Sequence, residues 1–290
     1  GISTYPIVPG HEIVGIVDAV GENVTRFKVG DKAGIGCIAD SCKNCDQCDK
    51  GKENYCRAGM TMSYGSPDPR LPGLSTYGGY SEKYVADEKY VLRVPDNLDF
   101  AAVAPLLCAG ITMFSPLIEC NVTEGSKVGI IGIGGLGHVG IKIARALGAE
   151  VYGFTSRESK VETIKALGAT DVIVTSSPEN INSFNGKLDL VIDTISDAHD
   201  ISPFLTTLRP EGTYTMVGAG DVKPPSFLML MRGLYYHGSA IGGIARTQEL
   251  LDLCSKHNIT ADIEIGHLQD LPTLFERIQN GDVRYRIVLD

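Results

Sequence analysis

The 290-residue sequence contains no tryptophan and has little positive charge. Its 26 Lys and Arg residues stand against 35 Asp and Glu residues, a net charge of −9. This balance argues against binding to nucleic acid or to anionic membranes. No uncharged apolar run reaches the roughly 18 residues of a membrane-spanning helix, so we expect no such helix. The first residues do not show the basic and then apolar pattern of a signal peptide.

Internal repeats and low-complexity tracts are also missing. Hydrophobic residues make up 43% of the chain and charged residues 21%, which is typical of a folded protein and argues against disorder. The length allows two domains, each with its own core. The 8 cysteines are too few and too unevenly spread for a secreted disulfide scaffold. We therefore expect a cytoplasmic protein with reduced thiols.

Half of the cysteines lie in one loop-like stretch, as Cys42, Cys45, Cys48 and Cys56. Four thiolates repel one another strongly unless a cation lies between them, and zinc prefers four soft ligands in a tetrahedron. A redox Cys-x2-Cys pair would not account for all four, and a chance cluster is a weaker explanation. The spacing predicts a closed, structural zinc site that does no chemistry.

The pattern of expected secondary structure changes at about residue 123. Before it, the sequence suggests strands at 13–17 and within 80–94, separated by an irregular stretch. After it, strands and helices alternate, which is typical of a doubly wound parallel sheet of the α/β class. We expect strands at 127–133, 150–155, 171–174, 188–194 and 213–217, and helices at 136–147, 157–167 and 200–208. Further helices are expected at 248–257 and 271–280, and a last strand at 286–289.

A glycine fingerprint, Gly132-x-Gly134-x-x-Gly137, lies between an expected strand and an expected helix. In this context the glycines allow a tight turn and the close approach of a pyrophosphate to the helix N-terminus. Gly135 and Leu136 belong to the same turn. The pattern alone could be an ordinary glycine-rich turn, but its position within a strand–helix unit predicts a dinucleotide site.

The next strand indicates which dinucleotide binds. NAD sites place an acidic residue at this strand end, where it binds the ribose 2′-hydroxyl. Here the strand ends in Thr155, Ser156 and Arg157, with Lys160 one turn later. Hydroxyl and cationic groups suit a 2′-phosphate, although Glu158 is an acid at the start of the following helix. We therefore predict NADP(H).

His11, Glu12 and Cys108 form a second candidate metal group. A catalytic zinc takes three protein ligands and keeps one position open, and His11 and Cys108 could supply two of the three. Taken singly, each has an ordinary explanation, as a surface histidine or a buried structural cysteine. Their occurrence with a four-cysteine loop and a dinucleotide fingerprint favours the metal site.

Together these motifs resemble the zinc-dependent medium-chain dehydrogenase/reductase family, also known as the zinc alcohol dehydrogenases. The segment Gly10-His11-Glu12-x2-Gly15-x5-Gly21 is similar to the family's zinc signature, and the cysteine loop to its structural-zinc lobe. The segments 5–12, 105–112, 132–137 and 241–243 resemble the cinnamyl-alcohol-dehydrogenase-like branch, which uses NADPH. The resemblance covers essentially the whole chain.

The resemblance implies a Rossmann doubly wound sheet plus a GroES-like β-rich catalytic domain. We expect the catalytic domain at 1–110 with its zinc lobe at 37–60, the NADP-binding domain at 111–243, and a return to the catalytic domain at 244–290. The family assigns His11 and Cys108 to a catalytic zinc, with Glu12 entering during ligand exchange. It also implies a homodimer, and nicotinamide contacts from Thr112, Val217, Gly218, Ser239, Ile241 and Gly242.

Family members begin with a further segment that carries another catalytic cysteine and the Ser/Thr and His of a proton relay. No part of this sequence matches that segment, so we expect an N-terminally incomplete chain with a weak catalytic zinc and slow turnover. Cys37 could be offered as a substitute ligand, but nothing in its sequence context supports it.

The predicted function is zinc- and NADP(H)-dependent interconversion of primary alcohols and aldehydes, of cinnamyl or broader aromatic and aliphatic type. The predicted partners are a small alcohol or aldehyde substrate and a second copy of the chain, with no nucleic acid and no membrane. One alternative is a polyol dehydrogenase of the mannitol type. Another is a non-catalytic homologue that binds NADPH and zinc. A metal-binding regulatory module is a more distant possibility.

Overall fold

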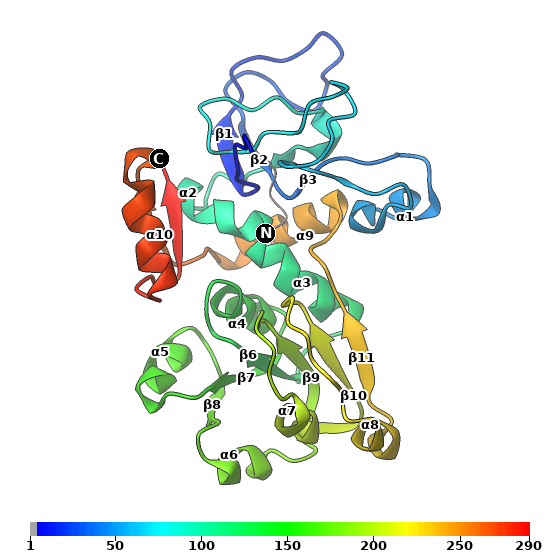
Figure 1. Ribbon diagram of the computed structural model, residues 1–290, viewed down its shortest axis with the longest axis vertical. Coiled ribbons are helices and arrows are strands. Elements are labelled where there is room, and N and C mark those ends of the chain that lie inside the picture. Colours follow the sequence, from blue (N-terminus) through cyan, green and yellow to red (C-terminus); the bar gives the residue numbers. More distant parts are fainter. Residues whose placement is uncertain (1–4) are drawn as a thin grey trace. The chain divides into compact units, whose positions relative to one another are not determined.

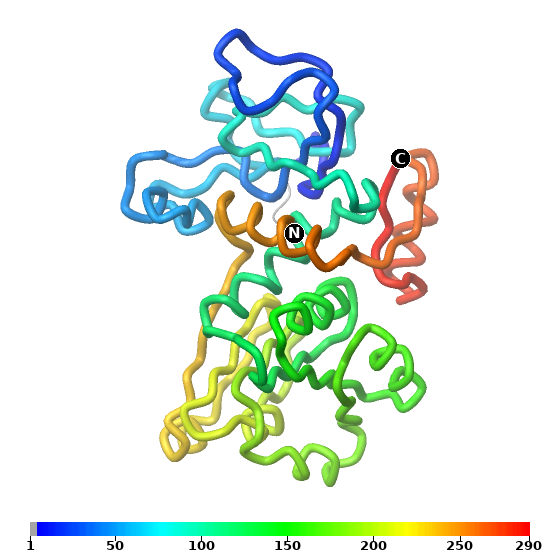
Figure 2. Tube along the Cα trace, turned by 180° about the vertical axis from the view of Figure 1, so that it is seen from behind, coloured from blue at the N-terminus to red at the C-terminus, as the bar shows by residue number. Residues whose placement is uncertain are grey.

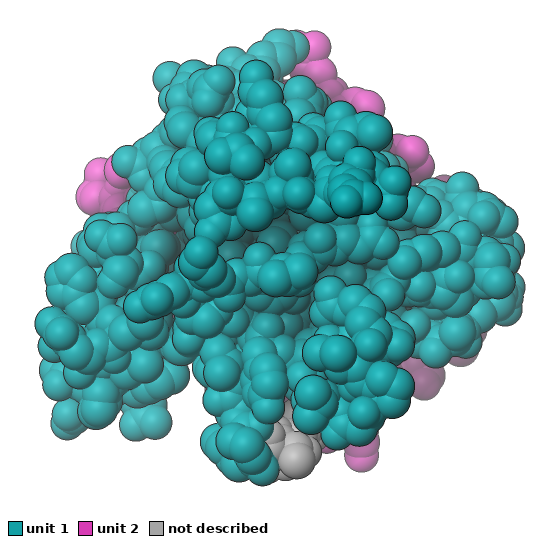
Figure 3. All heavy atoms as spheres, turned by 90° about the horizontal axis from the view of Figure 1, so that it is seen from above, with its two compact units in different colours: residues 1–111, 241–290 teal, residues 112–240 magenta. Residues whose placement is uncertain are grey.

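The computed structural model describes residues 5–290, and the chain forms two compact units. The first unit comprises residues 1–111 and 241–290, and the second comprises 112–240, as coloured in Figure 3. The colours of the trace in Figure 2 follow the sequence, in which the green and yellow part, residues 112–240, comes between the two segments of the first unit. The sequence placed these breaks after residues 110 and 243.

The second unit is built on a six-stranded parallel sheet with the order β11-β10-β9-β6-β7-β8 (Figure 1). The strand order reverses between β6 and β9, where such sheets bind ligands beyond the carboxyl ends of their strands. This is the predicted doubly wound order. The strands are β6 (Lys127–Ile131), β7 (Glu150–Thr155), β8 (Asp171–Val174), β9 (Leu188–Asp193), β10 (Leu208–Met216) and β11 (Tyr235–Gly238).

Helices cover this sheet and leave its central strands buried. β6 and β9 are almost entirely buried because their β-branched and leucine side chains meet helices on the sheet faces. For example, α4 packs on β6 and β7, and α7 packs on β9 and β10. The helices are α4 (Gly137–Ala146), α5 (Val161–Ala166), α6 (Pro178–Ser183), α7 (Ser202–Thr207) and α8 (Ser226–Arg232), with a 3-10 turn η4 (Glu158–Lys160).

The first unit is richer in short strands and irregular segments. One antiparallel sheet has the order β1 (Ile13–Ile16), β2 (Lys32–Ile35) and β5 (Leu92–Arg93). A second, two-stranded antiparallel sheet pairs β3 (Ile38–Asp40) with β4 (Thr61–Met62). A third pairs β12 (Ile263–Gly266) in parallel with β13 (Arg286–Leu289). Its helical elements are α1 (Asp46–Asp49), η1 (Glu53–Tyr55), η2 (Glu88–Tyr90), α2 (Phe100–Val103), η3 (Ala104–Leu107), α9 (Ile244–His257), η5 (Leu268–Asp270) and α10 (Leu271–Gln279). The remaining helix, α3 (Ala109–Glu119), begins in this unit and continues into the second.

No single helix within residues 5–290 is long and apolar enough to cross a membrane. One bent pair, residues 100–107 and 109–119, passes the same test jointly. Most of its side chains are buried, as in the core helices of many proteins.

The prediction of strands across 80–94 is wrong for most of that range, where only β5 is a strand. Residues 80–91 include instead the 3-10 turn η2, whose start is capped by Asp87 through its carboxylate, which accepts the amide of Lys89. The sequence also did not indicate α3, α6, α8 or β11. β10 begins earlier than expected, with a register shift between Leu208 and Thr213.

Candidate zinc and nucleotide sites

The four thiols of the cysteine loop come together in the first unit. All their sulfurs lie within 4.8 Å of one another, for Cys42, Cys45, Cys48 and Cys56. The Sγ of Cys48 is 3.9 Å from that of Cys42 and 3.6 Å from that of Cys45. Zinc–sulfur bonds of about 2.3 Å place the sulfurs of a tetrahedral site about 3.8 Å apart. The four thiols therefore fit one zinc ion and leave no position for a substrate.

Backbone amides around the loop favour the thiolate form of Cys45. The amide of Arg57 donates to the Sγ of Cys45 at 3.5 Å. This bond, followed by that from the amide of Cys48, lowers the pKa of Cys45 to about 6. The Arg57 guanidinium also binds the carboxylate of Asp46, which lowers the pKa of Asp46. The loop thus contains a thiolate close to neutral pH, as a zinc ligand requires.

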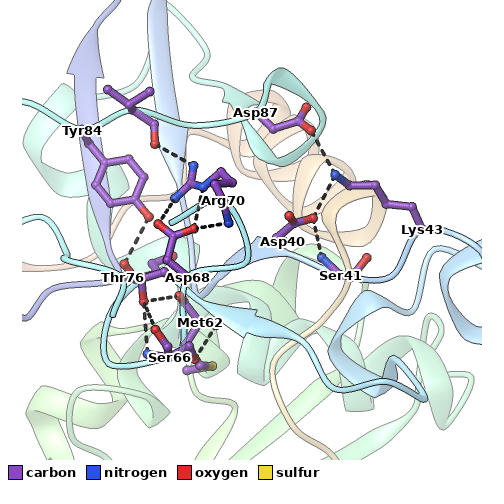
Figure 4. A network of polar contacts seen from close by, with 12 residues as sticks. Asp40, Ser41, Lys43, Met62, Ser66, Asp68, Arg70, Thr76, Tyr84 and Asp87 are labelled. Carbon is purple, nitrogen blue, oxygen red and sulfur yellow. Dashed lines mark hydrogen bonds and ion pairs between the residues drawn. The ribbon is translucent and has the colours of Figure 1, made fainter. Parts of the chain in front are cut away.

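Ion pairs tie the start of this loop to the rest of the unit. Lys43 lies between Asp40 and Asp87, with its Nζ 3.0 Å and 3.2 Å from their carboxylates (Figure 4). Ser41, next to the first cysteine, shares a hydrogen bond of 2.8 Å with the hydroxyl of Tyr90. These contacts hold the position from which the cysteines begin.

A second network in Figure 4 holds the segment that follows the loop. Arg70 donates through Nε and Nη2 to the two carboxylate oxygens of the buried Asp68, at 2.9 Å each. The hydroxyl of Thr76 donates to the carbonyl of Met62 at 2.9 Å, and the amide of Met62 donates to Ser66 at 2.9 Å. Because Met62 lies in β4, which pairs with β3, this network supports the strand that follows Cys37.

The second metal-type cluster is formed by His11, Cys37 and Cys108, whose ligand atoms lie within 4.8 Å of one another. The Nε2 of His11 is 3.2 Å from the Sγ of Cys108, although 97 positions separate the two residues. One imidazole and one thiolate on a tetrahedral zinc lie about 3.5 Å apart. The sequence offered no reason to include Cys37. The structure places Cys37 in the cluster, because it follows β2 and the end of β2 packs against the residue before Cys108.

The protons of this cluster are shared unequally. The hydrogen bond to Cys108 raises the pKa of His11. Hydrogen bonds from Cys37 and His11 lower the pKa of Cys108 well below its usual range, although burial opposes this. The pKa of Cys37 is raised by its hydrogen bond to Cys108 and by burial. These contacts favour the thiolate form at Cys108 and the thiol form at Cys37.

The imidazole of His11 is held flat against a neighbouring ring. It stacks on Tyr64 with the ring centroids 5.7 Å apart and an angle of 4° between the planes. Its Nδ1 is buried and has no hydrogen-bond partner among the described residues, whereas Nε2 faces Cys108. The ring thus presents one nitrogen, Nε2, to the cluster.

Glu12 lies outside this group of ligand atoms. Both of its carboxylate oxygens accept hydrogen bonds from Nη2 of Arg286, at 2.5 and 2.6 Å. Burial raises the pKa of Glu12, while the nearby Arg286 acts in the opposite direction. The structure therefore places Glu12 beside the cluster but in an ion pair with a residue of β13.

A pocket of about 360 Å³ lies in the second unit at the predicted fingerprint. It is lined by Gly132, Ile133, Gly134, Gly135, Leu136, Lys160, Thr194 and Ile195. Gly132 has a φ of +82°, which glycine adopts without strain. A Cβ on Gly137 would lie 2.4 Å from the carbonyl oxygen of Gly132. These glycines allow the turn and its close packing on the start of α4, the helix end that attracts phosphate.

Sequence reasoning missed Thr194 and Ile195 as pocket residues. They follow β9 directly, and β9 neighbours β6 across the switch point, so the strand order predicts their position once the sheet is known. The hydroxyl of Thr194 donates to the carbonyl of Gly132 at 2.8 Å and holds the glycine turn.

The predicted nicotinamide residues lie in different places. Val217 and Gly218 donate their amides to the carbonyl of Asp193, so their segment lies beside Thr194 and Ile195. Ser239, like Thr112, is buried in the second unit. Ile241 and Gly242 belong to the first unit.

Lys160 is the only predicted 2′-phosphate residue that lines this pocket. Thr155 ends β7 beside β6, and its hydroxyl accepts the amide of Arg157 at 3.2 Å. Ser156 and Arg157 are exposed beyond the strand end. The strand next to the fingerprint thus carries hydroxyl and cationic groups at its tip.

Two known protein families match the chain. The alcohol dehydrogenase GroES-like domain matches residues 1–96, and the zinc-binding dehydrogenase family matches residues 135–256. Among curated proteins, the chain is similar to the aldehyde reductase YahK of Escherichia coli, with 47% identity over 292 residues. The alignment covers 99% of this chain and 83% of that protein.

Solved structures of alcohol dehydrogenases are also similar to the chain. A cinnamyl alcohol dehydrogenase from Sorghum bicolor has 38% identity and a TM-score of 0.95, covering 99% of this chain and 82% of that one. A cinnamyl alcohol dehydrogenase from Helicobacter pylori, complexed with NADP(H), has 37% identity and a TM-score of 0.91, covering 99% and 83%. Both units therefore have the fold expected from the sequence, a Rossmann sheet and a GroES-like domain.

Proposed function

Because this chain belongs to the zinc-dependent medium-chain dehydrogenase/reductase family, in its cinnamyl-alcohol-dehydrogenase-like branch, we propose that it interconverts primary alcohols and aldehydes with NADP(H) and zinc. The relatives are alcohol dehydrogenases and aldehyde reductases, so the chain is an enzyme of the alcohol dehydrogenase type. The proposal adds the cofactor, the zinc and the class of substrate. The observation that carries it is the meeting of His11 and Cys108 at 3.2 Å in a chain that also holds a dinucleotide pocket.

Two features support NADP(H) over NAD(H). No acidic residue occupies the end of β7, where an NAD site would bind the ribose hydroxyls. Arg157 lies just beyond that strand end and Lys160 lines the pocket, so two cations are near the position of a 2′-phosphate. The similar enzyme from Helicobacter pylori also binds NADP(H).

A zinc ion bound at this cluster supplies a Lewis acid that polarises a carbonyl or alcohol oxygen. His11 offers Nε2 to the ion, and its stacking on Tyr64 keeps the ring in the required plane. The lowered pKa of Cys108 favours the thiolate form, which is the form that binds zinc. Arg286 binds both carboxylate oxygens of Glu12 and compensates its charge. The buried Glu12 therefore adds little negative charge beside the zinc ligands.

NADP(H) supplies the hydride when it is bound. The chain holds the cofactor in place. Fixing two reactants in position before they react lowers the barrier, because their translational and rotational entropy is lost on binding and not in the chemical step. The turn Gly132–Gly137 and the start of α4 suit the pyrophosphate, and Thr194 keeps that turn in shape. The four-cysteine zinc contributes to folding and not to chemistry.

We also propose that the protein works in the cytoplasm as a homodimer. Among the described residues, β11 has a hydrogen-bonded neighbour on one side only. Large apolar side chains are exposed on β11 and on the nearby α8: Phe227, Leu230, Met231 and Tyr235. An open strand edge with exposed apolar residues favours pairing with a second copy. Sedimentation of the chain should give the mass of two chains, and replacing Leu230 with Lys should give one.

The first experiment is to follow the loss of NADPH absorbance with cinnamaldehyde and zinc, with NADH in parallel. We expect turnover that prefers NADPH. Mannitol with NADP⁺ is the substrate comparison, and faster oxidation of mannitol than of cinnamyl alcohol would favour a polyol dehydrogenase.

The matched variants are Cys108→Ser and Cys120→Ser. Cys120 is half-buried and lies in neither metal-type cluster. Cys108→Ser should abolish turnover and still bind NADPH, whereas Cys120→Ser should keep most of the activity. Unchanged turnover in Cys108→Ser would contradict the assignment. NADPH binding without turnover in the wild-type chain would favour a non-catalytic homologue.

A further inference from the structure

We propose that Asp193 is a positioning residue for the dinucleotide. Its buried side chain and its carbonyl hold the segments that follow β6, β9 and β10, where the nucleotide pocket lies. The inference rests on the proposed function, because it concerns how that pocket keeps the shape that binds NADP(H). Every residue involved belongs to the second unit.

Asp193 is the last residue of β9, and its side chain is completely buried. A buried carboxyl group costs free energy unless hydrogen bonds satisfy its oxygens. Here both oxygens are satisfied. Oδ1 accepts the amide of Ile195 at 2.9 Å, and Oδ2 accepts the hydroxyl of Tyr214 at 2.5 Å. Each oxygen thus ties a different part of the second unit to the end of β9.

Tyr214 and His199 both contact Oδ2 of Asp193. Tyr214 lies in β10, is fully buried and stacks on Tyr236, with the ring centroids 5.9 Å apart. Burial, and then the hydrogen bond to Asp193, raise the pKa of Tyr214, so its hydroxyl keeps the proton that it donates. The Nε2 of His199 lies 2.9 Å from the same oxygen, without the alignment of a hydrogen bond. A strand and a loop therefore fix the position of this carboxylate.

The amide that Oδ1 accepts belongs to the wall of the nucleotide pocket. Thr194 and Ile195 both line that pocket. The amide of Thr194 donates to the carbonyl of Ile131 at 3.2 Å, and its hydroxyl donates to the carbonyl of Gly132 at 2.8 Å. Because Thr194 directly follows Asp193, a displaced Asp193 would disturb the glycine turn as well.

The carbonyl of Asp193 holds a third segment. It accepts the amides of Val217 at 3.0 Å and Gly218 at 3.2 Å, the two residues after β10 that are predicted to contact the nicotinamide. This segment packs on the pocket wall, since a Cβ on Gly218 would lie 2.1 Å from the carbonyl oxygen of Ile195. The strands β10, β9 and β6 are neighbours at the point where the strand order reverses. One buried residue thus joins the segments beyond three adjacent strand ends.

A purely structural role of Asp193 makes a different prediction, and Asp189 is the matched comparison. Asp189 lies near the amino end of the same strand, four residues or about 13 Å from Asp193. Its carboxylate likewise accepts a backbone amide, that of Lys127 at 2.7 Å, and a side-chain donor, the Nε of Arg209 at 2.5 Å. Asp189 does not line the nucleotide pocket. Asp189→Asn and Asp193→Asn therefore alter the same kind of contact at opposite ends of β9.

The experiment measures dissociation constants for NADPH and NADH from nicotinamide fluorescence, without substrate, together with the melting temperature. Asparagine offers one acceptor oxygen in place of two, so Asp193→Asn leaves the amide of Ile195 or the hydroxyl of Tyr214 without its acceptor. We expect affinity to fall about 10–100-fold for both cofactors, because binding must restore the displaced wall. Asp189→Asn should lower the melting temperature and change affinity less than about 2-fold.

Two further readouts separate positioning from stability. Hydrogen exchange of the cofactor-free chain should be faster at residues 194–195 and 217–218 in Asp193→Asn but not in Asp189→Asn. With cinnamaldehyde, the loss should appear in KM for NADPH and not in kcat, because the cofactor that does bind restores the wall.

Wild-type affinity for NADPH in Asp193→Asn, with a melting temperature lowered as in Asp189→Asn, would overturn the proposal. A loss confined to NADPH would place the effect at Lys160, beside the 2′-phosphate, and would overturn it too. Tyr214→Phe is the milder variant if Asp193→Asn does not fold. It should weaken both cofactors about 3–10-fold, and unchanged affinity would again contradict the role of Asp193.

The wild-type chain keeps this test distinct from that of the proposed function. Wild-type chain that binds neither cofactor would refute the proposed use of NADP(H), and the positioning role with it. Wild-type chain that binds NADPH, beside an Asp193→Asn protein that binds it equally well, would refute the positioning role alone.

Discussion

Gly36 and Leu107 pack backbone against backbone: a Cβ built on Gly36 would lie 2.8 Å from the carbonyl oxygen of Leu107. The contact joins the end of β2 to the segment just before Cys108. It explains how a cysteine with no recognisable sequence context reaches a metal-type cluster. Any side chain at position 36 would push these segments apart.

We predict that Gly36→Ala destabilises the protein by about 1–3 kcal/mol, the usual cost of overpacking a close contact. It should also weaken zinc binding at His11 and Cys108, because the segment that precedes Cys108 is displaced. Chemical unfolding and zinc titration measure the two effects. Gly15→Ala is the control: a Cβ there meets nothing within 4 Å. Equal effects of the two substitutions would argue against the contact.

Loss of one ligand from the four-cysteine loop should have a different result. Cys45→Ser is expected to remove one zinc per chain and to lower the melting temperature, because zinc binding there contributes folding free energy. Cofactor binding should be largely retained, since the nucleotide pocket lies in the other unit. Metal analysis, thermal melting and NADPH titration test this. A Cys45→Ser protein with normal zinc content would show that the four thiols do not share an ion.

The preference for NADPH should depend on Arg157 and Lys160. Removing either cation by alanine should raise KM for NADPH about 10–100-fold, from the roughly 1.5–3 kcal/mol of a charge-assisted hydrogen bond. KM for NADH should change much less, because NADH has no 2′-phosphate. Lys165→Ala is the control, since Lys165 lies on α5 and pairs with Asp171 at 3.4 Å. Equal losses for both cofactors would contradict the assignment.

Stability in acid should depend on Asp68, whose side chain is 6% exposed and bound by Arg70. The hydrogen bond from Arg70 lowers the pKa of Asp68 below its usual range. The pair therefore stabilises the folded protein fully above about pH 4, and the contribution disappears as the pH falls through the lowered pKa. At neutral pH, Asp68→Asn should cost about 1–3 kcal/mol.

Measuring the free energy of unfolding from pH 7 to pH 3 checks the sign. The difference between wild type and Asp68→Asn should shrink below about pH 4. Asp18→Asn is the control, because Asp18 pairs with Lys83 at the surface, where solvent and salt weaken the interaction. A gap between wild type and Asp68→Asn that stays constant with pH would show that the ion pair is not its source.

The sheet of the second unit was the most predictable part of the fold. Its strands are short apolar runs separated by helices, and that alternation depends on residues close in sequence. β11 was missed because its residues, such as Tyr235 and Tyr236, are exposed at the sheet edge and show no buried run. The expected strands in 80–94 failed because the apolar pattern does not show that Asp87 caps a 3-10 turn within this range.

The sequence by itself determined the four-cysteine cluster and the glycine fingerprint. In both, the interacting residues lie on one turn or loop, so their spacing alone sets which atoms can meet. Only the tertiary structure decided that Cys37 joins His11 and Cys108, and that Arg286 binds Glu12 across 274 positions. Such partners are distant in sequence, and packing details such as the missing side chain of Gly36 determine whether they touch.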